Sequence, residues 1–132
     1  MSKRNLEITR RSIEAYCRGD WDESLSYIDP EAEWLFETAL DVPNRSLGHA
    51  EIRALWAGIA EPFDDFTSEL KELIDAGDRV FVRQWFAGRG RGSEIQVEGD
   101  FFGVMTVSGD KITRIAYYST RSEALEAAGL PA

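Results

Sequence analysis

The segment from residue 73 to residue 121 constrains the fold of this chain most, because it reads as three long strands in succession. Side chains of a strand point alternately to its two sides. Along residues 80–87 one face therefore carries Val80, Val82, Gln84 and Phe86, and the other carries Phe81, Arg83, Trp85 and Ala87. Large apolar side chains on both faces predict a sheet that is covered on both sides. We expect this sheet to form one wall of a pocket.

The remaining elements follow from spacing and turn residues. Apolar positions predict helices over residues 5–18, from Asp20 to residue 28 and from residue 48 onwards through Phe63, with a short helix capped by Ser122 at the end. Strands are predicted at 31–37, 66–74, 80–87, 101–107 and 112–119, and residues 38–47 are predicted as a loop. The order is helix, helix, strand, helix and four strands.

That order predicts an α+β fold rather than alternating βαβ units. We expect a cone, in which a curved, mostly antiparallel sheet carries the three helices of the N-terminal half over its concave face. The sheet side that the helices leave open predicts a symmetric homodimer, formed sheet against sheet.

Length, charge and residue counts limit the number of domains, the kinds of partner and the metal sites that we expect. A chain of 132 residues predicts one domain, 1–132, and a net charge of −9 disfavours a nucleic-acid partner. The sequence has no long apolar run and no apolar core near its start, so we expect no membrane partner and a cytoplasmic location. Cys17 and His49 are single residues of their kinds, which leaves no Cys/His zinc set. No metal and no cofactor are expected.

Five segments carry a resemblance to a known family: GHAEIRALW, ELIDAGDRV, GRGRGSEIQVEG, VMTVSGDKITRI and SEALEAAGL. In this order and at these separations they resemble the SnoaL-like family of the nuclear-transport-factor-2-like (ketosteroid isomerase-like) superfamily. The resemblance covers nearly the whole chain and implies the cone fold. The superfamily includes ketosteroid isomerases, polyketide cyclases, epoxide hydrolases and many members without a known activity, so fold membership does not decide function.

The catalytic groups that the resemblance implies are not matched. Ketosteroid isomerases carry a tyrosine, an aspartate that acts as the base, and a protonated aspartic acid. The corresponding positions here are Ser12, Phe36 and Gly103, in that order. Tyr117 stands where SnoaL-type cyclases carry an acid, and a phenol with a pKa near 10 is a poor substitute for a carboxylate base. The only Arg-x-Asp of the kind that limonene-type epoxide hydrolases use lies at residues 18–20, at a helix end.

A mostly aromatic set is expected on the cavity side instead. Arg83 is the polar exception, since a buried guanidinium needs a carboxylate, a ring or an anion; Glu37, Asp41 and Glu98 are its candidate internal partners. The expected ligand-binding residues are Tyr16, Trp34, Phe36, Trp56, Arg83, Trp85, Phe101, Met105 and Tyr117.

Three functions remain open. The first is binding of a hydrophobic small molecule, apolar or aromatic and with an anionic group for Arg83. The second is a polyketide cyclase or isomerase-like acid/base enzyme, with Tyr16 and Tyr117 as donors to an oxyanion and Asp41 or His49 moving the proton. The third is a ligand-free dimerisation module whose cavity is filled by side chains.

Overall fold

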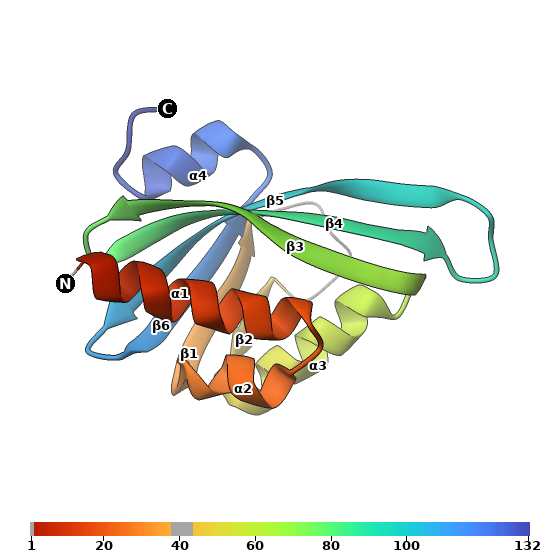
Figure 1. Cartoon of the computed structure of the whole chain (residues 1–132), viewed down its shortest axis with the longest axis horizontal. Coiled ribbons are helices and arrows are strands. Elements are labelled where there is room, and N and C mark those ends of the chain that lie inside the picture. Colours follow the sequence, from red (N-terminus) through yellow and green to blue (C-terminus); the bar gives the residue numbers. More distant parts are fainter. Residues whose placement is uncertain (1, 38–43) are drawn as a thin grey trace.

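Six strands form one curved, open sheet in the computed structural model, which describes residues 2–37 and 44–132 (Figure 1). The strand order is β2-β1-β6-β5-β4-β3. The elements of the described chain are α1 (Ser2–Cys17), α2 (Trp21–Ser26), β1 (Ile28–Glu37), β2 (Arg45–Leu47), α3 (Gly48–Ala60), β3 (Phe63–Ala76), β4 (Arg79–Gly90), β5 (Gln96–Ser108), β6 (Lys111–Tyr118) and α4 (Arg121–Ala127). The predicted α+β class is confirmed.

Strands β3 to β6 are an antiparallel meander, and β1 adds to it in parallel with β6. Tight turns connect the meander, and Gly109 supplies the positive φ of 65° that the turn between β5 and β6 requires. The β4–β5 hairpin extends beyond the helices at the end opposite the N-terminus (Figure 1). The result is a sheet that is mostly antiparallel, as expected.

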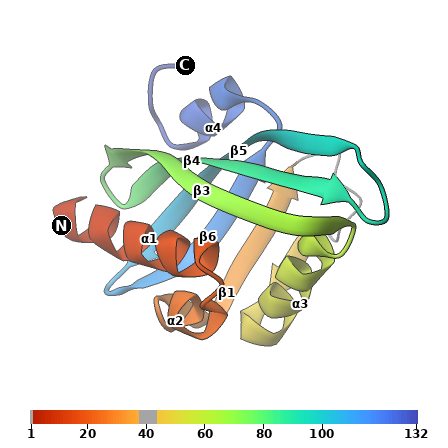
Figure 2. The ribbon, with the colours of Figure 1, turned by 45° about the vertical axis from the view of Figure 1, so that its right-hand side comes forward.

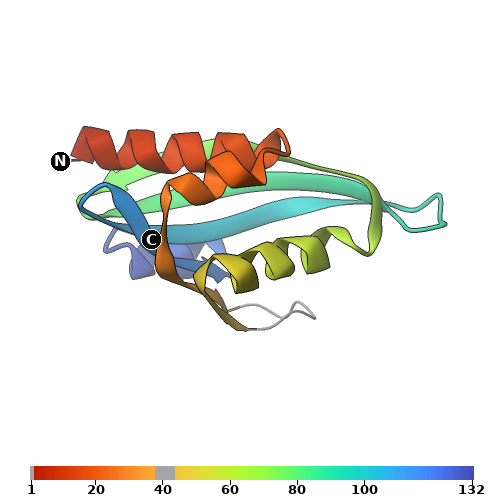
Figure 3. The same ribbon diagram turned by 90° about the horizontal axis from the view of Figure 1, so that it is seen from below.

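Helices α1, α2 and α3 cover one face of the sheet, and α4 lies on the other face (Figures 2 and 3). The larger core lies beneath the first three helices and includes Ile52 and Ile112, both fully buried. A smaller core beneath α4 contains Phe81, Val104 and Leu125. Apolar side chains on both faces of the long strands are therefore buried against helices, which is the main stabilising contribution to this fold.

Local signals set the ends of the first two helices. Gly19 adopts a φ of 85° just after α1, a conformation that glycine reaches without strain and that ends the helix. Asp20 then caps α2, since its carboxylate accepts the backbone N–H of Glu23 at 3.1 Å. Both features agree with the sequence-based predictions.

Several predicted boundaries are wrong. Ile28 does not belong to the second helix but begins β1. Residues 45–47 are not loop but the short strand β2, which pairs antiparallel with β1. Phe63 does not extend α3, because it begins β3 opposite Gly90. The cap of α4 is Thr120 rather than Ser122: the Thr120 hydroxyl accepts the backbone N–H of Glu123 at 3.2 Å.

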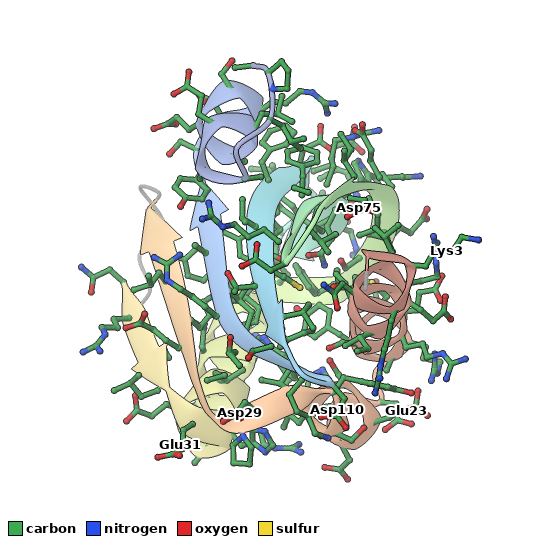
Figure 4. All side chains as sticks on the ribbon, turned by 90° about the vertical axis from the view of Figure 1, so that its left-hand side faces the viewer. Lys3, Glu23, Asp29, Glu31, Asp75 and Asp110 are labelled. Atoms are coloured by element: carbon green, nitrogen blue, oxygen red, sulfur yellow. The ribbon has the colours of Figure 1, made fainter. Side chains whose placement is uncertain are left out.

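Charged side chains lie mainly on the outside of the molecule. Figure 4 shows Lys3 of α1 and Glu31 of β1 at its periphery, and both are exposed. Within the part of the chain that the structure describes, no helix combines the length and apolar character needed to cross a membrane.

Candidate small-molecule cavity

A cavity lies between the concave face of the sheet and the three helices that cover it. Each covering helix contributes to its wall: Tyr16 from α1, Ser24 from α2 and Trp56 from α3. The sheet contributes Trp34, Phe36, Ser68, Gln84, Phe101, Met105 and Tyr117, and the lining is completed by Ser12, Ile13, Ile28 and Ile59. Seven of the nine expected ligand-binding residues therefore come together here.

The cavity is narrow in this structure, with a volume of about 40 Å³. A water molecule needs roughly 10–15 Å³ of cavity volume, and a protein cavity that takes up benzene measures about 150 Å³. The present cavity thus has room for a few water molecules. A ligand with a ring would have to displace side chains of the wall.

Aromatic rings make up most of the wall. Trp34 lies at the centre of the group, stacked on Tyr117 with ring centroids 5.4 Å apart and packed edge-on against Trp56 at 5.9 Å. Tyr16 contacts Trp56 edge-on at 4.9 Å, and Phe101 packs against Tyr117 at 6.0 Å. Rings in these arrangements present both apolar faces and polarised edges to a bound molecule.

Two hydrogen-bond donors of this wall have no partner among the residues that the structure describes. The indole Nε1 atoms of Trp34 and Trp56 are buried and make no hydrogen bond with any described residue. A buried donor without an acceptor costs roughly 1–3 kcal/mol of stability, and most such groups in folded proteins are satisfied. Both tryptophans line the cavity, so an acceptor on a bound molecule could remove this cost.

A chain of polar side chains crosses the sheet side of the cavity. The Tyr117 hydroxyl donates to Oε1 of Gln84, and Nε2 of Gln84 donates to Oγ of Ser68 at 3.5 Å. The thiol of Cys17 donates to the same Ser68 oxygen at 3.6 Å. Gln84 and Ser68 are both buried, so β3, β4 and β6 share one buried polar network. Strand alternation puts Gln84 on the face opposite Arg83, but no sequence signal marked it as a site residue.

Burial controls the ionisation of the tyrosines. It raises the pKa of Tyr16 and of Tyr117 well above the usual value, because a phenolate would lose its hydration. Burial also raises the pKa of the Cys17 thiol, against the opposing effect of its hydrogen bond to Ser68. Near neutral pH these groups are protonated, so they act as hydrogen-bonding groups and not as bases.

Gly103 makes room for the ring of Tyr117. The two residues are cross-strand partners, and a Cβ atom on Gly103 would lie 2.8 Å from Cε1 of Tyr117. Gly103 is the position at which the resemblance implied a protonated aspartic acid. The Tyr117 ring now occupies the space into which that side chain would extend.

The expected inward orientation of Arg83 and Trp85 is wrong. Arg83 lies on the outer face, where Nε is 3.4 Å from Oε1 of Glu72 and Nη1 is 3.3 Å from Oδ1 of Asp100. Trp85 is the cross-strand partner of Asp100 on β5. The ammonium group of Lys71 lies 5.9 Å from the centre of the Trp85 ring. The face of β4 that contributes to the cavity is instead the one that carries Gln84.

Two of the candidate catalytic residues lie elsewhere or outside the described residues. His49 lies at the start of α3, where its Nε2 is 2.8 Å from the carbonyl oxygen of Ile28. It does not line the cavity. Asp41, like the side chain of Glu37, is not among the parts that the structure describes. The described lining residues include no Asp, Glu or His, and the described chain contains no group of three or more such residues or cysteines placed to hold a metal ion.

The cone-shaped sheet with helices over an apolar cavity defines the nuclear-transport-factor-2-like class of fold. Solved structures of this class superpose on nearly the whole chain. One is TerC co-crystallised with polyporic acid, with 24% identity, a TM-score of 0.77 and coverage of 96% of this chain and 98% of the other. A second is an NTF2-like protein from Burkholderia thailandensis E264, with 23% identity, a TM-score of 0.79 and the same coverage.

A third structure is a putative SnoaL-like polyketide cyclase from Jannaschia sp. CCS1, with 17% identity, a TM-score of 0.75 and coverage of 99% and 95%. Identities at this level show the shared fold alone. The family model of the SnoaL-like domain matches residues 9–115, and this chain belongs to that family. A search of curated proteins gave no match.

Proposed function

We propose that this SnoaL-like domain binds an uncharged, largely apolar small molecule with a hydrogen-bond acceptor in the cavity between its helices and sheet. The observation that carries the proposal is the pair of unpartnered indole donors, Trp34 and Trp56, in the wall of one apolar cavity. An acceptor within hydrogen-bonding reach of either indole would satisfy a donor that the described residues leave without a partner.

The ligand is uncharged in this proposal because the described lining residues supply no countercharge. Arg83, the cation expected to hold an anionic group, pairs with Glu72 and Asp100 on the outer face of the sheet. A charge moved into an apolar cavity without a partner would lose several kcal/mol of hydration. A neutral carbonyl or hydroxyl group avoids that cost.

Binding widens the cavity. The present volume of about 40 Å³ is too small for a ring, so a ligand must displace part of the aromatic wall. Tyr16 and Trp56 stand on the covering helices rather than on the sheet, and they are the rings that move. A structure of the same fold, TerC, was co-crystallised with polyporic acid, which supports binding of a small molecule by this fold but does not bear on the charge of the ligand.

Calorimetric titration with 1-indanol and 1-indanone tests this proposal. Both probes are rigid, uncharged and apolar apart from one oxygen at the same position. We expect saturable binding of at least one probe at one site per chain. Trp56→Phe keeps an aromatic ring but removes the indole donor, and should weaken binding by roughly two- to tenfold, the value of one hydrogen bond.

Trp85→Phe is the matched control, because Trp85 lies on the outer face and should not affect binding. Absence of saturable binding by either probe would contradict the proposal. An equal loss in Trp56→Phe and Trp85→Phe would show that the probes do not bind in the cavity.

A second candidate function is a dimerisation module without a ligand, and three observations favour it. The cavity is nearly filled by side chains, and internal carboxylates satisfy Arg83. Trp85, Phe102 and Tyr118 are only partly buried on the outer sheet face, where a second copy would cover them. Dimerisation on the outer face would not block the cavity on the other face of the sheet, so the presence or absence of a ligand is what separates the two candidate functions.

Light scattering on an eluting size-exclusion peak tests the dimer. The dimer predicts twice the chain mass of 14.9 kDa. Trp85→Glu should shift the mass to the monomer, whereas Lys3→Glu, on the exposed side of α1, should leave it unchanged. A monomeric wild-type chain at micromolar concentration would contradict this second function.

A further inference from the structure

The polar network beside the cavity fixes which hydrogen-bonding atom Tyr117 can offer to a ligand. A phenol has one proton to donate and oxygen lone pairs that accept. The Tyr117 proton is engaged by Oε1 of Gln84. A molecule in the cavity can therefore use the Tyr117 oxygen only as a hydrogen-bond acceptor.

Gln84 is itself held in this orientation. Its Nε2 donates to Oγ of Ser68 at 3.5 Å, so its amide oxygen is turned towards Tyr117. The Cys17 thiol also donates to Ser68, which makes that oxygen an acceptor of two hydrogen bonds. Gln84 is only 5% exposed and cannot exchange Tyr117 for bulk water as a partner.

Tyr117 keeps its proton over the whole neutral range, because burial raises its pKa and disfavours the phenolate. It therefore remains a neutral acceptor for the ligand and does not become an anion. The wall then presents opposite polarities at neighbouring points: donors at Trp34 and Trp56, and an acceptor at Tyr117, whose ring stacks on Trp34.

We propose that Gln84 is a positioning residue that makes the cavity selective for a hydroxyl group, so that the ligand is an alcohol or phenol rather than a ketone or ether. A hydroxyl can accept from an indole N–H and donate to the Tyr117 oxygen, whereas a carbonyl can only accept. This inference deepens the proposed function and rests on it. It assigns to Gln84 a role that acts through Tyr117, without contact to the ligand being required.

The matched probes separate the two proposals. Wild-type protein should bind 1-indanol more tightly than 1-indanone by roughly two- to tenfold, the value of one additional hydrogen bond. Equal binding of both probes would overturn the selectivity while leaving the proposed function intact. Binding of neither would remove the proposed function itself.

Gln84→Leu tests the positioning role. The variant frees the Tyr117 proton, which can then donate to a carbonyl, so 1-indanone should gain affinity and the preference should fall towards one. An unchanged preference would overturn the role of Gln84.

Tyr117→Phe provides a second test that does not depend on the folding of Gln84→Leu. It removes the acceptor but keeps the ring, so it should weaken 1-indanol by roughly two- to tenfold and leave 1-indanone unchanged. Equal weakening of both probes would mean that Tyr117 donates to the ligand, and would contradict the proposal. Denaturant unfolding of each variant confirms that folded protein is being titrated.

Discussion

Gly103 and Tyr117 face each other across β5 and β6, and a Cβ on Gly103 would come within 2.8 Å of the Tyr117 ring. Real Cβ atoms do not approach a ring so closely, so Tyr117 can take this position only because residue 103 is a glycine. Because Tyr117 is buried and packs on Trp34, its ring has little room to yield. The position of the Tyr117 ring in the cavity wall therefore depends on which residue of β5 lies opposite it.

Gly103→Ala should therefore destabilise the fold. Overpacking a filled core costs about 1–3 kcal/mol, and we expect a loss of that size in the free energy of unfolding by urea. Gly58→Ala is the control, because Gly58 lies in α3 and a methyl group added there would meet nothing within 4 Å. That substitution should stabilise α3 by about 0.5–1 kcal/mol. A neutral Gly103→Ala would show that Tyr117 moves freely.

The pH dependence of stability should report the buried Tyr117 hydroxyl. Its pKa is raised in the folded protein, while in the unfolded chain it is about 10. Above that pH the unfolded state loses the proton and the folded state keeps it, so stability falls as the pH rises. The stability difference between wild type and Tyr117→Phe should shrink by about 1 kcal/mol from pH 10 to pH 11. A difference that stays constant over this range would mean that Tyr117 ionises in the fold.

Glu72 should stabilise the attachment of α4 to the sheet. Arg121 of α4 donates to both carboxylate oxygens of Glu72, at 2.7 and 2.9 Å, and lowers the pKa of that carboxyl. The stabilisation is present above the unfolded pKa and is lost as the pH falls through the lowered folded pKa. Glu72→Gln should cost about 0.5–1 kcal/mol at pH 7, allowing for solvent screening.

The comparison of wild type with Glu72→Gln at pH 7 and pH 3 checks this. The difference in unfolding free energy should become smaller at the lower pH, where the carboxyl of residue 72 takes up a proton and loses its charge. Glu69→Gln, which alters an exposed pair with Lys71, is the control and should have little effect at either pH. A Glu72 effect that grows at low pH would contradict the ion-pair account.

Cys17 should react slowly with thiol reagents. It is half-buried, its pKa is raised chiefly by burial, and the thiolate is the reactive form. As the only cysteine it reports on one place in the fold. Modification by an aromatic disulfide reagent at pH 8 should be at least about tenfold slower in the folded protein than in guanidinium chloride. Equal rates would mean that the end of α1 opens readily.

The fold could be predicted from the sequence because its signals are local. Gly19 and Asp20 stop one helix and cap the next, and the strand alternation and tight turns of the meander specify an antiparallel sheet. The strand β2 could not be found in this way. It has three residues, too few for a period, and it is specified by its pairing with β1.

The cavity wall was predictable where one face of an element is clearly apolar, as at Trp34 and Trp56. It was not predictable in β4, because alternation separates two faces without saying which one is inside. The cross-strand register decides that question: Gln84 pairs with Phe101 in the cavity, and Arg83 pairs with Phe102 on the outer side. Apolar residues beneath α4 made the outer face look like a core face.

Nuclear magnetic resonance of ¹⁵N-labelled protein can follow the four indole N–H signals during titration with 1-indanol. Trp34 and Trp56 should shift in a saturable way, because their unpartnered donors gain an acceptor, while Trp85 on the outer face should not. Single Trp→Phe variants assign the signals. If the Trp34 and Trp56 signals stay in place up to the solubility of the probe, or move no more than that of Trp85, the cavity is not a binding site for this class of molecule.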